Sequence, residues 1–342
     1  MVARALLLLA VLGSAPAAMA AAAAPPAAEA ARLADRSLLT AVAAAGTRLV
    51  AVGDRGIIVY SDDRGGHWTQ AATVPTQALL TGVCFFDARQ GIAVGHDLVA
   101  LRSSDGGRSW VRTHDAPDAQ GPLLDVWCGP DGQAIAVGAY SAYLTSADAG
   151  ATWQERPFAP AAPGGSGAAK AAAAGAGSGG GFHLNRIAAA AGARLYIAAE
   201  AGHLYRSDDA GASWRTLASP YEGSFFGVLP LGADALLAYG LRGNLYRSPD
   251  GGATWQKLVS GTLAMLDGGV RSGGLEVVLV GLSGVVLVSA DGGRSFTLQQ
   301  QADHSGLAAV AALASGRIVA VGETGARVLE LAGTAGAAGA GP

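Results

Sequence analysis

The sequence lacks the excess of basic residues that nucleic-acid binding needs. Only 14% of its 342 residues are charged, and the formal net charge at pH 7 is −3. No run of five or six like charges occurs anywhere in the chain. Nucleic-acid binding needs a basic patch, and recruitment to anionic membranes often uses a polybasic segment. We therefore expect no nucleic-acid partner and no polybasic membrane anchor.

The common catalytic and metal-binding signatures are missing as well. The six histidines include no H-x-x-x-H pair, and none of them lies close to a cysteine. There is no G-x-S-x-G, no phosphate-binding P-loop and no Rossmann fingerprint, because the many Gly-Gly pairs stand in turns. The sequence thus predicts no catalytic residues, no metal and no cofactor.

Long hydrophobic runs are also absent, apart from a short one near the start. Arg4 precedes an apolar run from Ala5 to Leu12, and small residues follow up to Ala18-Met19-Ala20. This pattern is typical of a signal peptide, and the run is shorter than the roughly 20 residues that span a bilayer. We predict a signal peptide at 1–20, a linker at 21–27 and a periplasmic or secreted protein. A retained membrane anchor is the alternative.

Cysteine is scarce, with only Cys84 and Cys128, which an exported chain would expose to an oxidising compartment. They stand at matching points of the segments "LLTGVC" and "LLDVWC". If these segments are equivalent strands, both side chains point to the same side of their own sheets. A disulfide needs Cα atoms within roughly 7 Å of each other. Two buried thiols are the favoured interpretation, and a disulfide is the alternative.

Glycine, by contrast, is abundant, with 51 residues, and much of it belongs to an internal repeat. The pattern Ser-x-Asp-x-Gly-x-x-Trp/Phe occurs six times, at Ser61–Trp68, Ser103–Trp110, Ser146–Trp153, Ser207–Trp214, Ser248–Trp255 and Ser289–Phe296. Successive copies are 41–43 residues apart, except that 61 separate Trp153 from Trp214. A low-complexity Ala/Gly stretch at 159–181 accounts for the excess, so we interpret it as a loop insertion.

Each repeat contains four strand-like segments, which is typical of a β-propeller blade that stacks on its neighbours. A seventh unit, Gly306–Ala332, has three such segments and lacks the motif. We predict an all-β, seven-bladed β-propeller of four-stranded blades over 28–332. Ala28–Ser37 is expected to supply the missing outer strand and so remove an open edge. The Gly/Ala tail at 333–342 is predicted to be disordered.

The repeated motif suits a turn between the third and fourth strands of a blade. Ser and Asp hydrogen-bond nearby backbone, Gly adopts positive φ, and the final Trp or Phe packs between blades. Six copies at a fixed period indicate a folding device, not a catalytic group. We assign this structural role to Asp63, Asp105, Asp148, Asp209, Asp250 and Asp291. Calcium binding is a weak alternative, because Ca²⁺ takes about six to eight oxygens.

The motif resembles the Asp-box, or bacterial neuraminidase repeat, of sialidases, xyloglucanases and several non-enzymatic propellers. Sialidases also carry three carboxylate-binding arginines, a Tyr–Glu nucleophile pair and an Arg-Ile-Pro stretch. No Arg-Ile-Pro occurs here, and the nearest Tyr–Glu couple, Tyr221-Glu222, is adjacent in a predicted turn. The motif therefore indicates a fold and not an enzyme.

Over the predicted mature chain, the sequence is similar to the photosystem II stability/assembly factor family of seven-bladed Asp-box propellers. The resemblance is carried by "RLVAVGDRGIIVYSDDRGGHW", "LYRSDDAGASW" and "ALLAYGLRGNLYRSPDGGATW", and "SPYEGSFFGV" looks like a signature of the bacterial, non-photosynthetic branch. It implies a non-catalytic role in assembling a membrane protein complex. Relatives in other bacteria look like periplasmic proteins that accompany RND-type exporters. The Ala/Gly insertion and Ala-rich strands depart from the family pattern.

Recognition is expected at one end of the propeller. If each first strand lines the central axis, the turns between second and third strands share an end with the connections between blades. Polar residues on these segments differ from blade to blade. The candidate partner-binding residues are Arg55, His96, Tyr140, Glu200, Tyr221, Glu222, Phe226, Arg242 and Glu323. Asn185 and Arg186 are predicted to enter the axial lining in a structural role.

Each candidate also has a structural interpretation. Arg55 and Arg242 are then solvated or pair with Asp54 and Glu200, and Tyr221-Glu222 form a plain turn. At least one of Phe225 and Phe226 belongs to the core.

Two hypotheses follow. The favoured one is a monomeric, non-enzymatic propeller that docks onto a membrane protein complex. The alternative is a glycan-binding or glycoside-hydrolase propeller, which would need two carboxylates roughly 5–9.5 Å apart. The candidates for such a pair are Asp54, Asp97, Glu200, Glu222 and Glu323, which come from separate blades.

Overall fold

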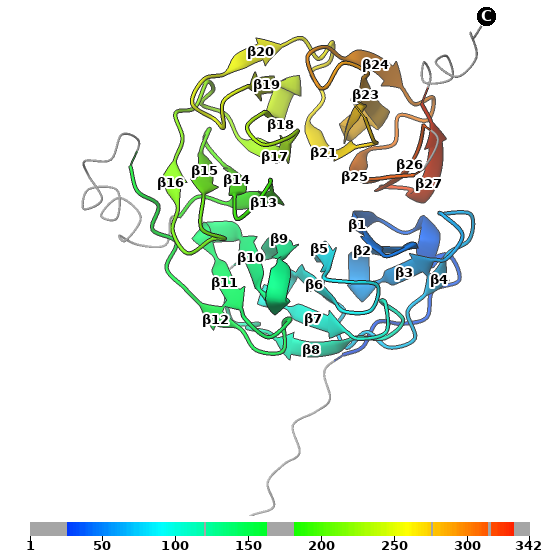
Figure 1. Cartoon of the computed structure of the whole chain (residues 1–342). Helices are drawn as coiled ribbons and strands as arrows, with labels where there is room; N and C mark the ends of the chain where they lie inside the picture. The colour runs from blue at the N-terminus through cyan, green and yellow to red at the C-terminus, as the bar shows by residue number, and fades with distance from the viewer. Residues whose placement is uncertain (1–25, 120, 163–180, 275, 314–315, 332–342) are drawn as a thin grey trace, which may run out of the picture.

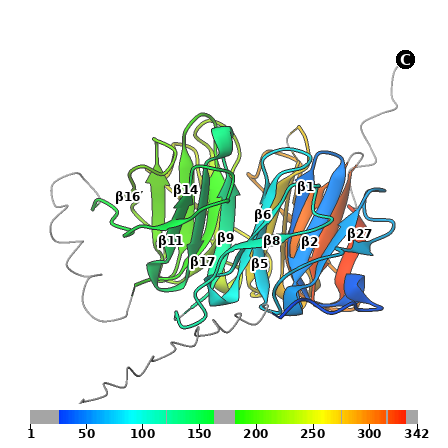
Figure 2. The ribbon, with the colours of Figure 1, turned by 90° about the horizontal axis from the view of Figure 1, so that it is seen from below.

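The computed structural model describes residues 26–119, 121–162, 181–274, 276–313 and 316–331 (Figure 1). The predicted signal peptide, most of the Ala/Gly insertion and the C-terminal tail lie outside these residues. The described chain forms seven antiparallel sheets arranged around a central axis. Seen from the side, the strands run roughly along that axis (Figure 2). The predicted all-β, seven-bladed propeller is confirmed.

Within each blade the strands follow one another in chain order, from the axis outwards. Blades 1 to 3 contain β1 (Leu39–Ala45), β2 (Arg48–Gly53), β3 (Ile58–Ser61), β4 (Thr69–Gln70), β5 (Leu80–Phe85), β6 (Gly91–Gly95), β7 (Ala100–Ser103), β8 (Val111–His114), β9 (Leu123–Cys128), β10 (Ala134–Gly138), β11 (Tyr143–Ser146) and β12 (Gln154–Glu155). Blades 4 to 7 contain β13 (Leu184–Ala189), β14 (Leu195–Ala199), β15 (Leu204–Ser207), β16 (Arg215–Thr216), β17 (Phe225–Pro230), β18 (Leu236–Gly240), β19 (Leu245–Ser248), β20 (Gln256–Leu258), β21 (Leu266–Arg271), β22 (Val277–Gly281), β23 (Val285–Ser289), β24 (Thr297–Gln300), β25 (Leu307–Ala312), β26 (Arg317–Gly322) and β27 (Gly325–Glu330).

The hydrophobic core lies between the blades. The second strands are rich in Val, Ile, Leu and Ala, and β2, β6, β10, β14, β18 and β22 are buried along their whole length. Both faces of such a strand are covered by neighbouring blades, which explains the continuous apolar sequence. One cluster of buried apolar side chains fills each of the seven interfaces between blades. No helix of the described residues is long and apolar enough to cross a membrane.

The ring closes by packing between blades 7 and 1, without the predicted extra strand. In the described chain blade 7 has three strands, so the prediction that Ala28–Ser37 completes it is wrong. The Ala28 N–H donates to the Val74 carbonyl beside blade 1, and Ala34–Arg36 forms the 3-10 turn η1 across the start of β27. This segment contains no β-branched residue that would favour a strand. Ala34 and Leu39 instead join the buried cluster shared with blade 7.

Cys84 of β5 and Cys128 of β9 form a disulfide between blades 2 and 3, with their Cα atoms 5.7 Å apart. The prediction of two buried thiols is therefore wrong. Leu80 and Leu123 occupy equivalent positions, because each lies opposite the last glycine of its second strand. Cys84 is thus the fifth residue of its strand and Cys128 the sixth. Successive residues of a strand point to opposite faces, so this offset of one residue lets the two sulfurs meet between the blades.

Candidate functional site

The turns between second and third strands, together with the connections between blades, form one end of the propeller, which we call the ring face. One backbone hydrogen bond recurs there in all seven blades: the first turn residue donates its N–H to the carbonyl that precedes the first strand. The donors are Asp54, His96, Ala139, Glu200, Leu241, Leu282 and Glu323. A uniform backbone therefore presents a different pair of side chains at each blade.

The charged candidates on the ring face differ in their surroundings. The Arg55 side chain is 83% exposed, and its Nε lies 3.4 Å from Asp54 Oδ2 in a solvated ion pair. Such exposed pairs contribute little to stability. His96 and Arg242 are exposed, and no hydrogen bond or ion pair joins the Arg242 guanidinium to any described residue. Arg242 is thus the candidate cation most available to a partner.

Glu200 and Glu323 occupy equivalent positions in blades 4 and 7 and bind their own backbone. The N–H of His183 donates to Glu200 Oε2 at 2.9 Å, and the N–H of Gly306 donates to Glu323 Oε2 at 2.9 Å. His183 Nδ1 also lies 3.5 Å from Glu200 Oε1. Both carboxylates therefore fasten a turn to the start of a first strand, and Glu200 does not pair with Arg242.

Aromatic side chains gather on the ring face at blades 3 and 4. Tyr140, about half exposed, meets the His183 ring edge-on at a centroid distance of 5.0 Å. The exposed Phe182 stacks on His203 at 4.0 Å, and His203 stacks in turn on Tyr205. Of these residues the sequence reasoning selected only Tyr140. The sequence signal that it passed over is "GFHL", where an aromatic residue and a histidine directly precede a first strand.

The segment that leads into blade 5, residues 221–226, is mostly buried or half-buried, whereas a recognition loop is expected to be exposed. The Tyr221 ring is half-buried and lies 5.8 Å from the Phe225 ring and 6.1 Å from the Tyr246 ring. Phe225 is fully buried, and Phe226 is a half-buried residue at the bulge of β17. Of this group only Glu222 is exposed.

A charged cluster joins the first strands of blades 3, 4 and 6. At the third position of the first strand five blades have Ala or Gly, whereas blade 3 has Asp125 and blade 4 has Arg186. The third member of the cluster, Asp267, is the second residue of β21. Arg186 Nε lies 3.9 Å from Asp125 Oδ2, and Arg186 Nη2 lies 3.8 Å from Asp267 Oδ1. Burial raises the pKa of both aspartates, and Arg186 opposes this rise only in part. Of the small residues, Gly82 lies directly beside the cluster, because a Cβ there would lie 3.0 Å from Asp125 Cα.

The partners of this cluster are mainly internal. Asp125 Oδ2 accepts the N–H of Ile187 at 3.0 Å, and the neighbouring Asn185 side chain donates to the Phe225 carbonyl of the next blade at 2.8 Å. Among the described residues no three His, Cys, Asp or Glu side chains come together as a set of metal ligands.

The six repeated motifs form the opposite end, the motif face, and each is closed by its own side chains. The motif Ser hydroxyl donates to the Asp Oδ1 in every copy, at 2.7–2.9 Å. The seventh motif residue donates its N–H to the same oxygen. The Thr152 hydroxyl, followed by the Thr152 N–H, lowers the pKa of Asp148 to about 2. Thr254 does the same to Asp250, whose pKa is also about 2.

The fifth motif residue, always glycine, lies against the preceding blade. Its φ is positive in every copy, between 74° and 90°. A Cβ on these glycines would meet Val319, Val50, Ile92, Ile135, Leu217 and Leu231 of the preceding blades. Each motif thus fits only where two blades come together.

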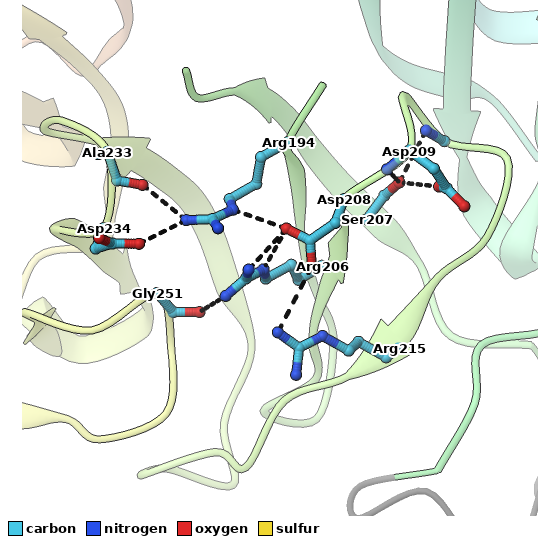
Figure 3. A network of polar contacts seen from close by, with 10 residues as sticks. Arg194, Arg206, Ser207, Asp208, Asp209, Arg215, Ala233, Asp234 and Gly251 are labelled. Atoms are coloured by element: carbon cyan, nitrogen blue, oxygen red, sulfur yellow. Dashed lines mark hydrogen bonds and ion pairs between the residues drawn. The ribbon is translucent and has the colours of Figure 1, made fainter. Parts of the chain in front are cut away.

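Arginine networks join blades on the motif face (Figure 3). Arg194 Nε lies 2.8 Å from Asp208, and its Nη1 lies 2.8 Å from Asp234 in the next blade. Arg206 also binds Asp208 and donates to the Gly251 carbonyl of that blade at 3.2 Å. Asp208 is the second residue of its motif. The equivalent Asp62 binds Arg48 at 2.7 Å, and Arg48 donates to the Gly106 carbonyl of blade 2 at 3.0 Å. The sequence reasoning did not single out these pairs.

Comparison with known proteins shows that the chain is similar in fold to several solved structures. No family model matches the chain, and no curated protein matches it in sequence. The structure of "YCF48 bound to D1 peptide" has a TM-score of 0.65 and 17% identity, covering 86% of this chain and 93% of that one. "YCF48 from Cyanidioschyzon merolae" has a TM-score of 0.64 and 17% identity, covering 86% and 95%. The WD40 β-propeller domain of Doa1 has a TM-score of 0.63 and 11% identity, covering 89% and 95%. Identities this low show the fold alone.

Proposed function

We propose that this protein is an exported, non-enzymatic propeller that docks through its ring face onto a membrane protein complex and assists its assembly or stability. The observation that carries this proposal is the ring face itself: one backbone hydrogen bond is repeated seven times, and the pair of residues at each turn differs from blade to blade. A repeated scaffold with varied tips is the arrangement expected of a binding surface.

Two further observations support the proposal. One of the two YCF48 structures holds YCF48 bound to a D1 peptide, and a propeller of similar shape is thus able to bind part of another protein. The disulfide between Cys84 and Cys128 suits an oxidising compartment such as the periplasm. In a bacterium without photosynthesis, an RND-type exporter is the partner that we would look for first.

Site-specific photo-crosslinking in cells tests the proposal. A photoreactive residue is placed at Tyr140 or Arg55 on the ring face, and at Arg64 on the motif face as the control. Arg64 is exposed and lies in the first motif. We expect the two ring-face positions to capture the same integral membrane protein and Arg64 to capture none. Equal capture from both faces would refute docking through the ring face. Turnover of a glycan, without capture of a protein, would favour the glycosidase alternative.

A further inference from the structure

The ring face carries an aliphatic patch over blades 5 and 6. Leu241 and Leu282 are the first residues of the turns η6 (Leu241–Gly243) and η7 (Leu282–Gly284). Val259 and Leu263 lie in the connection between the two blades, and each is 85% exposed. Leu298 of β24 completes the set; it and the two turn leucines are 37–41% exposed.

These five side chains come from adjoining segments. A Cβ on Gly243 would overlap the Thr262 carbonyl, so the turn of blade 5 lies directly against the connection. A Cβ on Gly261 would lie 3.7 Å from Leu298 Cδ2. The Leu282 N–H donates to the Met265 carbonyl at 2.9 Å. The connection 259–265 therefore borders both turns and β24, and we group the five aliphatic residues on and beside it as one patch.

The connection is a defined turn. The Ser260 hydroxyl donates to the Thr262 carbonyl at 3.2 Å, and the Ala264 N–H donates to Thr262 Oγ1 at 3.0 Å. Val259 and Leu263 thus flank a short segment that is fastened by its own polar groups. Two almost fully exposed aliphatic side chains on such a tip have no packing role within the chain. Exposed apolar groups of this kind mark contacts with other proteins or with membranes.

The charges beside the patch favour a membrane. Arg242 follows Leu241 directly, and Lys257 precedes Val259 by two residues. Neither forms an ion pair with a described residue; the Lys257 ammonium lies 5.8 Å from the centre of the Tyr246 ring.

The neighbouring carboxylates are mostly engaged. Asp303 Oδ2 binds Arg327 at 2.6 Å, and Glu323 accepts the Gly306 N–H. Glu222 is the exposed carboxylate on the preceding connection. Aliphatic tips bordered by long cationic side chains match the layers of a lipid surface, with acyl chains below phosphate groups.

We infer that the ring face over blades 5 and 6 rests on a lipid bilayer, with Val259 and Leu263 among the acyl chains and Arg242 and Lys257 at the headgroup phosphates. Contact through aliphatic tips needs no polybasic segment, so it agrees with the charge pattern of the sequence. The inference does not depend on which protein, if any, docks on the remaining ring face.

Vesicle co-sedimentation tests it. The chain without residues 1–20 is mixed with vesicles of phosphatidylcholine and phosphatidylglycerol, or of phosphatidylcholine alone. We expect sedimentation with the mixed vesicles, weaker binding to the neutral ones, and loss of the difference at high salt. The double variant Val259→Asp/Leu263→Asp should reduce partitioning by at least about tenfold, because it removes the inserted apolar surface. The variant Arg242→Glu/Lys257→Glu should weaken binding to the mixed vesicles only.

Val111→Asp provides the matched control. Val111 is an exposed aliphatic residue at the start of β8, where the chain leaves the motif face, and this variant should bind vesicles like the unmodified chain. Equal binding by the control and the double variant would overturn the inference, and so would absence of binding to both kinds of vesicle. If a photo-crosslinker at Leu263 captures a protein while vesicles are not bound, the patch is a protein interface. That result would refute lipid contact and leave docking intact.

Discussion

Replacing Gly150 with alanine should destabilise the propeller more than the same replacement at Gly192. Both glycines have positive φ, 78° and 70°. A Cβ on Gly150, the fifth residue of the third motif, would lie 2.8 Å from Ile92 Cδ1 and 2.9 Å from Ile92 Cγ1. Ile92 is fully buried between blades 2 and 3. A Cβ on Gly192 would meet nothing within 4 Å. The pair therefore separates backbone strain from packing between blades.

The magnitudes follow from these two contributions. The left-handed conformation costs an alanine about 1–2 kcal/mol, and the reduced freedom of the unfolded chain returns about 0.4–1 kcal/mol. Gly192→Ala should therefore lower the free energy of unfolding by roughly 0–1.5 kcal/mol. Overpacking against a buried side chain adds about 1–3 kcal/mol. Gly150→Ala should thus lower the free energy of unfolding by about 1–4.5 kcal/mol.

Urea unfolding, followed by tryptophan fluorescence, measures both variants under the same conditions. The midpoint for Gly150→Ala should fall well below that for Gly192→Ala, with a similar dependence on urea concentration. Equal losses would refute the reasoning, because positive φ alone would then explain the motif glycine. The packing of each motif against the preceding blade would have no energetic role.

Three further outcomes are expected. Replacing Cys84 and Cys128 by serine should lower the free energy of unfolding by about 4 kcal/mol in the chain-entropy model for a separation of 44 residues, and urea unfolding of the native chain with reductant should match that of the variant. In the same assay, Arg48→Met should lower the free energy of unfolding by about 1–3 kcal/mol, because the Arg48 side chain is only 9% exposed and binds Asp62. Arg108 is the control: it is more exposed and lies 3.8 Å from Asp62, so Arg108→Met should lower the free energy of unfolding by less than about 0.5 kcal/mol. Asp148→Asn should destabilise the propeller at pH 7 but much less near pH 2. The pKa of Asp148 is lowered to about 2 in the folded chain, so the stability that its carboxylate contributes is lost as pH falls from about 4 towards 2. An equal loss of unfolding free energy at both pH values, measured by urea unfolding, would contradict this.

The architecture was predictable because it repeats. Six copies of one motif at a nearly constant period, together with a seventh unit of strand-like segments, predict the number of blades and the place of six of the turns. The apolar second strands follow from being covered on both faces. The interior of each motif was predictable for the same reason, since Ser and Asp find their partners within seven residues.

Features that depend on register or on partners far along the chain were not predictable. The disulfide depends on an offset of one residue between β5 and β9, and only the pairing with the second strands reveals it. Arg186 meets Asp125 and Asp267 from 61 and 81 residues away, on three different blades. The closing segment Ala28–Ser37 was assigned to a strand because blade 7 lacked one, although its own composition gave no such indication.

The ring face shows a different limit. Sequence reasoning looked for polar residues at turn tips, and so selected Glu200 and Glu323, which the structure shows bound to their own backbone. It passed over Leu241 and Leu282 at the same turn position, since a leucine between glycines in "YGLRG" and "VGLSG" looks like core. The equivalent position is polar in four of the seven blades and leucine in two adjacent ones. Leu241 and Leu282 are 37% and 41% exposed, and what sets them apart is their position on neighbouring blades beside the exposed Val259 and Leu263. It is this grouping, and not the exposure of either leucine alone, on which the inferred lipid contact rests.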